Sequence, residues 1–182
     1  MDDELIDILN EDLTIQKTCL KSYAHMHGLL HASVHIWFYT SSGEVLLQRR
    51  AKTKIAFPSL WDISVAGHIT SGENKYEAAI REVKEEIGID ISKKELINIG
   101  AFKEKIKHTS SFLDNEIHHL FLCQLNFEIE QLNIQVEELS ELKLISIEEF
   151  QNDLKSLSSK KEYVPNQQNY YKIIISEISK YL

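Results

Sequence analysis

Apolar residues recur at two different spacings along this chain, and each spacing predicts a different kind of element. Residues 32–50 place β-branched and aromatic side chains on both sides of the polar sequence SSGE, which is the pattern of a β-hairpin. Residues 77–87 are good helix formers whose apolar members return every three or four positions, and Gly88 follows where a helix would end. We therefore predict a hairpin and, after it, an amphipathic helix.

The rest of the chain continues this mixture of strands and helices. After a basic loop come two short extended pieces, residues 60–64 and 65–69. Beyond Gly88, the apolar runs predict strands at residues 96–106, 117–129 and 141–147, and helices at residues 146–157, with Ser146 as N-cap, and 166–182. Because strands come in runs as well as in alternation with helices, we expect an α/β fold in which helices flank a mixed sheet.

The length of 182 residues suits a single domain with a substantial core. We divide the chain into an N-terminal extension, residues 1–30, and a core, residues 31–182, that includes the C-terminal helix. Within the extension, residues 5–18 are expected to form a small β-hairpin of two short strands with a turn at residues 10–12. A short amphipathic helix over residues 3–9 is the alternative.

Composition and charge narrow the classes of partner. A formal net charge of -8 argues against binding to a nucleic acid polymer or to an anionic membrane, because both need a basic surface. The two cysteines have no metal-ligand spacing, and the chain opens with acids where a secretory signal would be basic. No segment approaches the roughly 20 apolar residues of a membrane span. We expect a cytoplasmic protein, in which a phosphate ligand would need a local basic pocket or a metal.

Three glutamates stand out on the predicted helix. At 100° per residue, Glu82, Glu85 and Glu86 fall within an arc of about 100°, beside the apolar stripe. In a cleft, repulsion between these carboxylates would raise their pKa values unless a cation lay among them. Such a cluster of oxygens suits Mg²⁺ or Mn²⁺, whereas the alternative is a solvated acidic helix face.

The spacing of the whole stretch favours the cation. In GHITSGENKYEAAIREVKEEIGI, residues 67–89, Gly67 is followed by five residues and Glu73, and then by seven residues and the sequence REVKEEIGI. This stretch resembles the Nudix box of the Nudix hydrolases at every defined position. The resemblance implies an α/β/α sandwich with a mixed central sheet, in which a divalent metal activates water to attack a phosphorus of a diphosphate linkage.

The resemblance also implies roles for individual residues. Glu82, Glu85 and Glu86 match metal-ligand positions, and the carbonyl of Gly67 matches a further ligand. Glu73 and Arg81 match a pair that orients the box. Glu82 is our candidate for the general base, and a glutamate outside the box, Glu116, is the rival.

Other segments resemble one branch of the family more closely. Residues 28–39, 46–69 and 114–125 look like isopentenyl-diphosphate isomerase and the isomerase-like Nudix hydrolases. In the isomerases a catalytic cysteine stands immediately before Gly-His, whereas this chain has Ala66 there. We therefore expect a hydrolase of a small diphosphate, such as a nucleoside diphosphate derivative. An isomerase and a non-catalytic Nudix-fold binding or regulatory module are the alternatives.

The isomerase resemblance implies two further sets of residues. A second metal site, suited to Mn²⁺ or Zn²⁺, would use His31, His68, Asp114 and Glu116, with His25 or His27 near the position of one more ligand. Ordinary hydrogen-bonded or surface histidines are the alternative to that site. Arg50 and Lys54 match positions that hold diphosphate, although they could also belong to a solvated basic loop. Residues 170–182 could form the surface of a homodimer.

Overall fold

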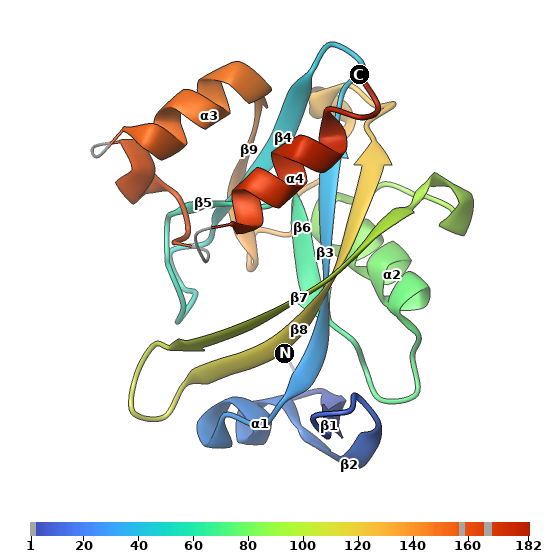
Figure 1. Ribbon diagram of the computed structural model, residues 1–182, viewed down its shortest axis with the longest axis vertical. Helices are drawn as coiled ribbons and strands as arrows, with labels where there is room; N and C mark the ends of the chain where they lie inside the picture. The colour runs from blue at the N-terminus through green and yellow to red at the C-terminus, as the bar shows by residue number, and fades with distance from the viewer. Residues whose placement is uncertain (1–2, 157–158, 166–168) are drawn as a thin grey trace.

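The computed structural model describes residues 3–156, 159–165 and 169–182, which form one mixed sheet with helices around it (Figure 1). The described strands are β1 (Leu5–Leu9), β2 (Ile15–Leu20), β3 (His31–Tyr39), β4 (Glu44–Arg50), β5 (Trp61–Asp62), β6 (Val65–His68), β7 (Ile97–Lys107), β8 (Leu113–Gln124) and β9 (Leu139–Ser146). The described α-helices are α1 (Lys21–His27), α2 (Lys75–Ile87), α3 (Ile147–Lys155) and α4 (Tyr170–Ile178).

Strand β3 is the centre of the sheet. It pairs in parallel with β8 along its whole length, from His31 opposite Glu116 to Tyr39 opposite Gln124. It pairs antiparallel with β1, β4 and β6, while β7 extends the sheet beyond β8 and β9 extends it beyond β4. Parallel and antiparallel ladders therefore meet at β3, which confirms the predicted mixed sheet.

The two faces of the sheet carry separate apolar cores because successive side chains of a strand point to opposite sides. Val34, Ile36 and Phe38 of β3 belong to the core that packs against α2. Trp37 and Tyr39 belong to the other core, which includes residues of α3 and α4. Figure 1 shows α2 on one side of the strands and α3 and α4 on the other. The predicted α/β/α sandwich is thus confirmed.

Capping interactions fix the ends of the helices. The side chain of Asn74 accepts hydrogen bonds from the backbone N–H groups of Tyr76 and Glu77, so α2 begins two residues before the predicted start. Gly88 ends α2 in the left-handed region, with φ at 78°, as predicted. Ser146 accepts a hydrogen bond from the N–H of Glu149 at the start of α3, which confirms it as an N-cap.

Several predicted boundaries differ from the structure. Residues 21–27 form α1, which the sequence analysis missed because this short segment has little apolar periodicity and docks mainly through the buried side chains of Ala24 and His25. The helix alternative over residues 3–9 was wrong, since β1 lies there and pairs with β2. Strand β8 begins at Leu113, where its ladder with β7 starts, instead of residue 117. It ends at Gln124, where its ladder with β3 ends, instead of residue 129. The predicted helix parts at residues 157 and 166–168 lie outside the described residues.

Among the residues that the structure describes, no helix combines the length and the apolar character needed to cross a membrane.

Candidate functional site

One cavity of about 540 Å³ brings together the chemistry predicted from separate parts of the chain. Its lining includes three of the glutamates of α2, the basic residues Arg50 and Lys54, and three residues from other elements. The three glutamates are Glu82, Glu85 and Glu86, and the other residues are His25, His68 and Glu116. Segments far apart in the sequence therefore share a single concave surface, which is the usual form of a small-molecule site.

Gly67 and Glu82 pack directly against each other at the wall of this cavity. A Cβ atom built at Gly67 would lie 1.9 Å from Cδ of Glu82, so only glycine leaves room for that carboxylate. Glu82 and Glu86 are 9% and 4% exposed, and Oε2 of Glu86 accepts a hydrogen bond from the N–H of Ala66 at 3.4 Å. Strand β6 and helix α2 thus hold two buried carboxylates beside the backbone of residues 66 and 67.

The electrostatics of these carboxylates favour a cation. Burial raises the pKa of Glu82 to about 7, even though Arg81 opposes the shift. Burial and then the neighbouring Glu82 raise the pKa of Glu86 well above its ordinary value. Glu85 differs from both, because its side chain is 52% exposed. Two buried carboxyls whose pKa values stay raised in spite of Arg81, next to a glycine that leaves them space, form an oxygen-rich donor set that fits a hard divalent ion.

Arg81 forms hydrogen bonds and ion pairs with several other parts of the box. Its guanidinium donates two hydrogen bonds to Glu73, at 3.0 and 2.9 Å, and one to the carbonyl oxygen of His68 at 2.9 Å. It also contacts Glu82 at 2.7 Å and Glu85 at 3.1 Å. One cation therefore links the loop before α2, strand β6 and two of the three glutamates, so the geometry agrees with an orienting role for Arg81 and Glu73.

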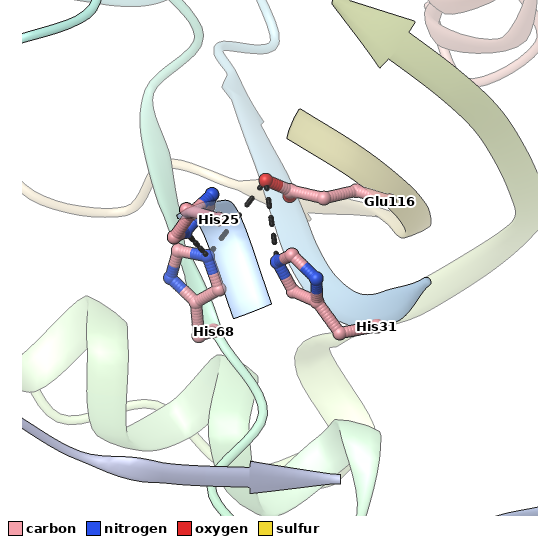
Figure 2. Close-up of side chains that lie close together, drawn as sticks. All are labelled: His25, His31, His68 and Glu116. Carbon is pink, nitrogen blue, oxygen red and sulfur yellow. Dashed lines mark hydrogen bonds and ion pairs between the residues drawn. The ribbon is translucent and has the colours of Figure 1, made fainter. Parts of the chain in front are cut away.

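A second group of donors lies at this cavity: His25, His68 and Glu116 line it, and the fully buried His31 lies beside them. Figure 2 shows the four side chains turned toward one another. One atom from each of His25, His31, His68 and Glu116 lies within 4.8 Å of all the others. Nε2 of His25 is 3.2 Å from Nε2 of His68, and Oε1 of Glu116 is 3.6 Å from Nε2 of His31 and 3.7 Å from Nε2 of His68. Ligands bound at about 2.1 Å from one ion lie roughly this far apart.

Contacts on the far side of two rings orient them, and the hydrogen bond at His31 leaves a nitrogen lone pair directed into this group. Nδ1 of His31 donates to the carbonyl oxygen of Leu29 at 2.8 Å, because a carbonyl can only accept. Nε2 of the neutral ring is then an acceptor, and it is buried without a hydrogen-bond partner among the described residues. Nδ1 of His25 lies 2.9 Å from Oδ1 of Asp114 in the same way. Orienting contacts of this type are typical of metal-bound histidines.

The carboxylate and the imidazoles of this second group shift one another's pKa values. Burial alone would raise the pKa of Glu116, but the imidazoles of His31 and His68 hold it well below its ordinary value. Burial alone would lower the pKa of His31, but Glu116 raises it. Three imidazoles and one carboxylate are a donor set that fits Zn²⁺ or Mn²⁺.

The structure places some predicted residues differently from the resemblance. Asp114 does not join the ligand group but instead contacts His25 and accepts from Nε2 of His108 at 2.6 Å. His25 takes part in the group, whereas His27 is exposed. Arg50 is paired with Asp62 at 2.8 Å and Lys54 is paired with Glu138, although both cations line the cavity.

Sequence reasoning missed His108 and a set of polar residues on two strands. Ser33, His35 and His118 also line the cavity. The available signal was alternation, since Asp114, Glu116 and His118 are two residues apart and therefore share one face of a strand. His31, Ser33 and His35 repeat this spacing on β3.

Comparisons with known proteins agree with this fold. The family model described as the NUDIX domain matches residues 29–167. An uncharacterized Nudix hydrolase of Clostridium acetobutylicum is 31% identical over 201 aligned positions, which cover 96% of this chain and 97% of the relative. An isopentenyl-diphosphate Delta-isomerase of Escherichia coli is 34% identical over 122 positions, which cover 66% of each chain.

A crystal structure of a protein from Deinococcus radiodurans has a similar fold, with a TM-score of 0.68. The match covers 96% of this chain and 98% of the other at 18% sequence identity, so it bears on the fold alone.

Proposed function

The chain belongs to the Nudix hydrolase family, and from this premise we propose that it hydrolyses a diphosphate linkage in a small-molecule substrate with the help of a divalent metal. The observation that carries this proposal is the pair of buried carboxylates, Glu82 and Glu86, beside Gly67 in a cavity that also holds Arg50 and Lys54. Such a site combines places for a cation and for an anionic substrate.

Glu82, Glu85, Glu86 and the carbonyl oxygen of Gly67 would hold the metal, Mg²⁺ or Mn²⁺. When bound, this ion would neutralise charge on the diphosphate and activate the attacking water. Arg50 and Lys54 would bind diphosphate oxygens by exchanging their present carboxylate partners, Asp62 and Glu138, for the substrate.

Glu82 is our candidate for the general base. Its buried carboxylate lines the cavity, and Arg81 holds it in place at 2.7 Å. Glu116 is the alternative base, and its low pKa keeps it ionised and ready to accept a hydrogen bond. Glu73 would act at a distance from the substrate by fixing the guanidinium of Arg81.

We also propose that His25, His31, His68 and Glu116 bind a second cation, Zn²⁺ or Mn²⁺. The buried lone pair on Nε2 of His31 supports this proposal. Asp114 and the carbonyl oxygen of Leu29 would fix the orientation of two of the rings without touching the ion.

Isomerase activity is the second candidate, because an isopentenyl-diphosphate isomerase is among the relatives. The chain offers no thiol for it in the described part of the cavity lining, where Ala66 stands at the position of the catalytic cysteine. Cys123 lies in the apolar core, and burial raises its pKa to about 12. Cys19 lies on β2, outside the lining. Acid and base chemistry at an isoprenoid carbon therefore lacks its reactive group, which favours hydrolysis.

A panel of diphosphates tests this function. We would measure phosphate or pyrophosphate release with Mg²⁺ and with Mn²⁺ from nucleoside diphosphates and triphosphates, nucleotide sugars, coenzyme A and isoprenoid diphosphates. Glu82→Gln and Glu86→Gln should each lower kcat by about 10²- to 10⁴-fold while the fold is retained. Glu148→Gln, at an exposed glutamate in the first turn of α3, is the matched control.

Three outcomes would contradict the proposal. Wild-type turnover in both box variants would refute the assigned site. Conversion of isopentenyl diphosphate to dimethylallyl diphosphate, without phosphate release, would identify an isomerase. Tight nucleotide binding without turnover under any metal would identify a binding or regulatory module.

A further inference from the structure

The N-terminal extension contacts the loop through which the chain enters helix α2. Elements β1, β2 and α1 precede residue 29, where the match to the family model begins. Strand β1 nevertheless lies beside the loop between β6 and α2. The N–H of Ser71 donates to the carbonyl oxygen of Leu5 at 2.8 Å, and Ile6 and Thr70 form an antiparallel bridge. A segment outside the family match is therefore hydrogen-bonded to the box itself.

The side chain of Asp7, on β1, makes three hydrogen bonds, two of them to this loop. Its Oδ1 accepts from the hydroxyl of Ser71 at 2.7 Å and from the hydroxyl of Thr18, on β2, at 2.8 Å. Its Oδ2 accepts from the N–H of Gly72 at 3.3 Å. Burial alone would raise the pKa of Asp7, but these hydrogen bonds lower it, so the group is a carboxylate at neutral pH. Hydrogen bonds to an ionised acceptor are stronger than neutral ones.

Hydrogen bonds, and not packing, fix the tip of this loop. Gly72 lies in the left-handed region with φ at 84°, which favours glycine. A Cβ atom built there would have no atom of a described residue within 4 Å, so packing leaves the position free. Because glycine has the most conformational freedom of all residues, other contacts must select its conformation. Asp7 supplies such a contact at Gly72 and another at the residue before it.

The conformation of this loop decides where Glu73 points. The N–H of Glu73 donates to the carbonyl oxygen of Thr70 at 2.9 Å, and its Oε2 accepts from the N–H of Thr70 at 3.1 Å. The same carboxylate accepts two hydrogen bonds from Arg81, which contacts Glu82 at 2.7 Å. A continuous set of hydrogen bonds therefore leads from Asp7, through the loop, to the carboxylates of α2.

We propose that Asp7 is a positioning residue of the box: it fixes the loop before α2, and so holds Glu73 and Arg81 where they orient the metal-binding carboxylates. The extension is then a working part of the site. Asp7 is not among the described residues that line the cavity, so it would act through the loop without touching the ion or the substrate. This inference rests on the proposed function, because that function makes the box a cation site.

Two variants, Asp7→Ala and Ser71→Ala, remove the contact from either side. Asp12→Ala is the matched control, because Asp12 is an exposed aspartate in the turn of the same hairpin and accepts from the N–H of Thr14 at 3.1 Å. Calorimetry would measure binding of Mg²⁺, which suits the box, and of Zn²⁺, which suits the histidine group. Hydrogen exchange followed by NMR would measure the protection of the Gly72 amide.

Zn²⁺ binding also reports whether the extension stays folded. His25, a member of the histidine group, lies on α1 of the same extension. If a variant unfolded the extension, His25 would lose its place and Zn²⁺ affinity would fall. A change confined to Mg²⁺ therefore separates positioning of the box from a general loss of structure.

Asp7→Ala should weaken Mg²⁺ binding by about 10-fold, which is the lower end of the range for groups outside the ligand shell. The amide of Gly72 should exchange about 10-fold faster, since it loses a hydrogen bond to a charged group. Zn²⁺ affinity should stay at the wild-type value. Ser71→Ala should change Mg²⁺ binding in the same direction by less, because Gly72 still donates to Asp7. The control should match the wild type in all three measurements.

On a substrate found with the diphosphate panel, Asp7→Ala should also lower kcat by about 10-fold at a fixed Mg²⁺ concentration. KM should change little, because Arg50 and Lys54, which would bind the diphosphate, lie outside the altered loop.

The outcomes separate this inference from the proposed function. Wild-type Mg²⁺ affinity in Asp7→Ala overturns the positioning role, even if Gly72 exchanges faster, and leaves the hydrolase standing. Equal losses of Mg²⁺ and Zn²⁺ affinity in both variants also overturn it, because the contact would then only keep the extension folded. Mg²⁺ affinity that depends on Asp7, in a protein that hydrolyses none of the diphosphates, supports the positioning role and overturns the hydrolase.

Discussion

Glu86 and Glu116 are both almost completely buried in the same cavity, at 4% and 7% exposure, yet their pKa values shift in opposite directions. Glu86 has another glutamate beside it, and burial raises its pKa. Glu116 faces His31, His68 and His118, and these rings lower its pKa in spite of burial. The neighbours decide whether a buried carboxyl is uncharged or charged.

This difference predicts two kinds of cation site. The box offers oxygen atoms and an excess of negative charge, with Arg81 shared among Glu73, Glu82 and Glu85. It therefore needs an external cation to be fully ionised, and hard ions such as Mg²⁺ fit it. The histidine group holds a single carboxylate among imidazoles and offers their nitrogen atoms to an ion, which fits Zn²⁺ or Mn²⁺.

The largest effect is expected from Gly67→Ala, which would disturb the box and leave the histidine group alone. The new Cβ would displace the end of the flexible Glu82 side chain, since the two would lie 1.9 Å apart. A carboxylate moved by about 1 Å can cost about 10²-fold in rate, so Mg²⁺-dependent hydrolysis should fall by at least that factor. Steady-state kinetics with Mg²⁺ measures it.

The control for Gly67→Ala is the melting temperature without metal, which should change little because Glu82 can swing toward the cavity. Zn²⁺ binding by the variant, followed by calorimetry, should equal that of the wild type. Full activity in Gly67→Ala would show that the close contact between Gly67 and Glu82 has no role in the site.

A smaller effect is expected from Asp114→Asn, which tests the histidine group. Asp114 contacts His25 from outside the group, and loss of such an orienting carboxylate typically lowers metal affinity by about 10- to 100-fold. His31→Gln removes a ligand and should abolish binding of one Zn²⁺ per chain in the same calorimetric titration. His27→Gln, at an exposed histidine of the same helix as His25, is the matched control. Unchanged Zn²⁺ affinity in His31→Gln would show that the histidine group is not a zinc site.

The smallest expected effect is a pH dependence of the stabilisation by Mg²⁺. In the metal-free protein the pKa of Glu82 is about 7, above the value near 4.5 for an exposed glutamate. The folded state then binds more protons than the unfolded state, so this group lowers the free energy of unfolding as pH rises from about 4.5 through 7. Because Mg²⁺ competes with that proton, the increase in melting temperature on adding Mg²⁺ should be larger at pH 8 than at pH 6.

Thermal melts at the two pH values, with and without Mg²⁺, measure this difference. Glu82→Gln has no carboxyl to titrate at this position, so the increase in melting temperature should differ less between the two pH values. An increase that is the same at both pH values would mean that Glu82 is not among the groups that compete for the ion.

The box could be predicted almost completely, whereas the histidine group could be predicted only in part. Glu82, Glu85 and Glu86 lie on one helix, so their spacing in the sequence already places them on neighbouring positions of its surface. His31, His68 and Glu116 were named from a resemblance, but Asp114 was assigned as a ligand and lies outside the group. His25 could not be chosen over His27, because the short helix α1 that selects it was not predicted.

The sequence by itself determined the α/β class, the helix that carries the box and the end of that helix at Gly88. These features depend on local periodicity and on a motif of 23 consecutive residues, 67–89. Only the tertiary structure decided that Ser33 and His118, 85 residues apart, are hydrogen-bonded, and that both line the same cavity as the box. Helical spacing is a property of one segment, whereas these contacts depend on strand register, which many distant residues set together.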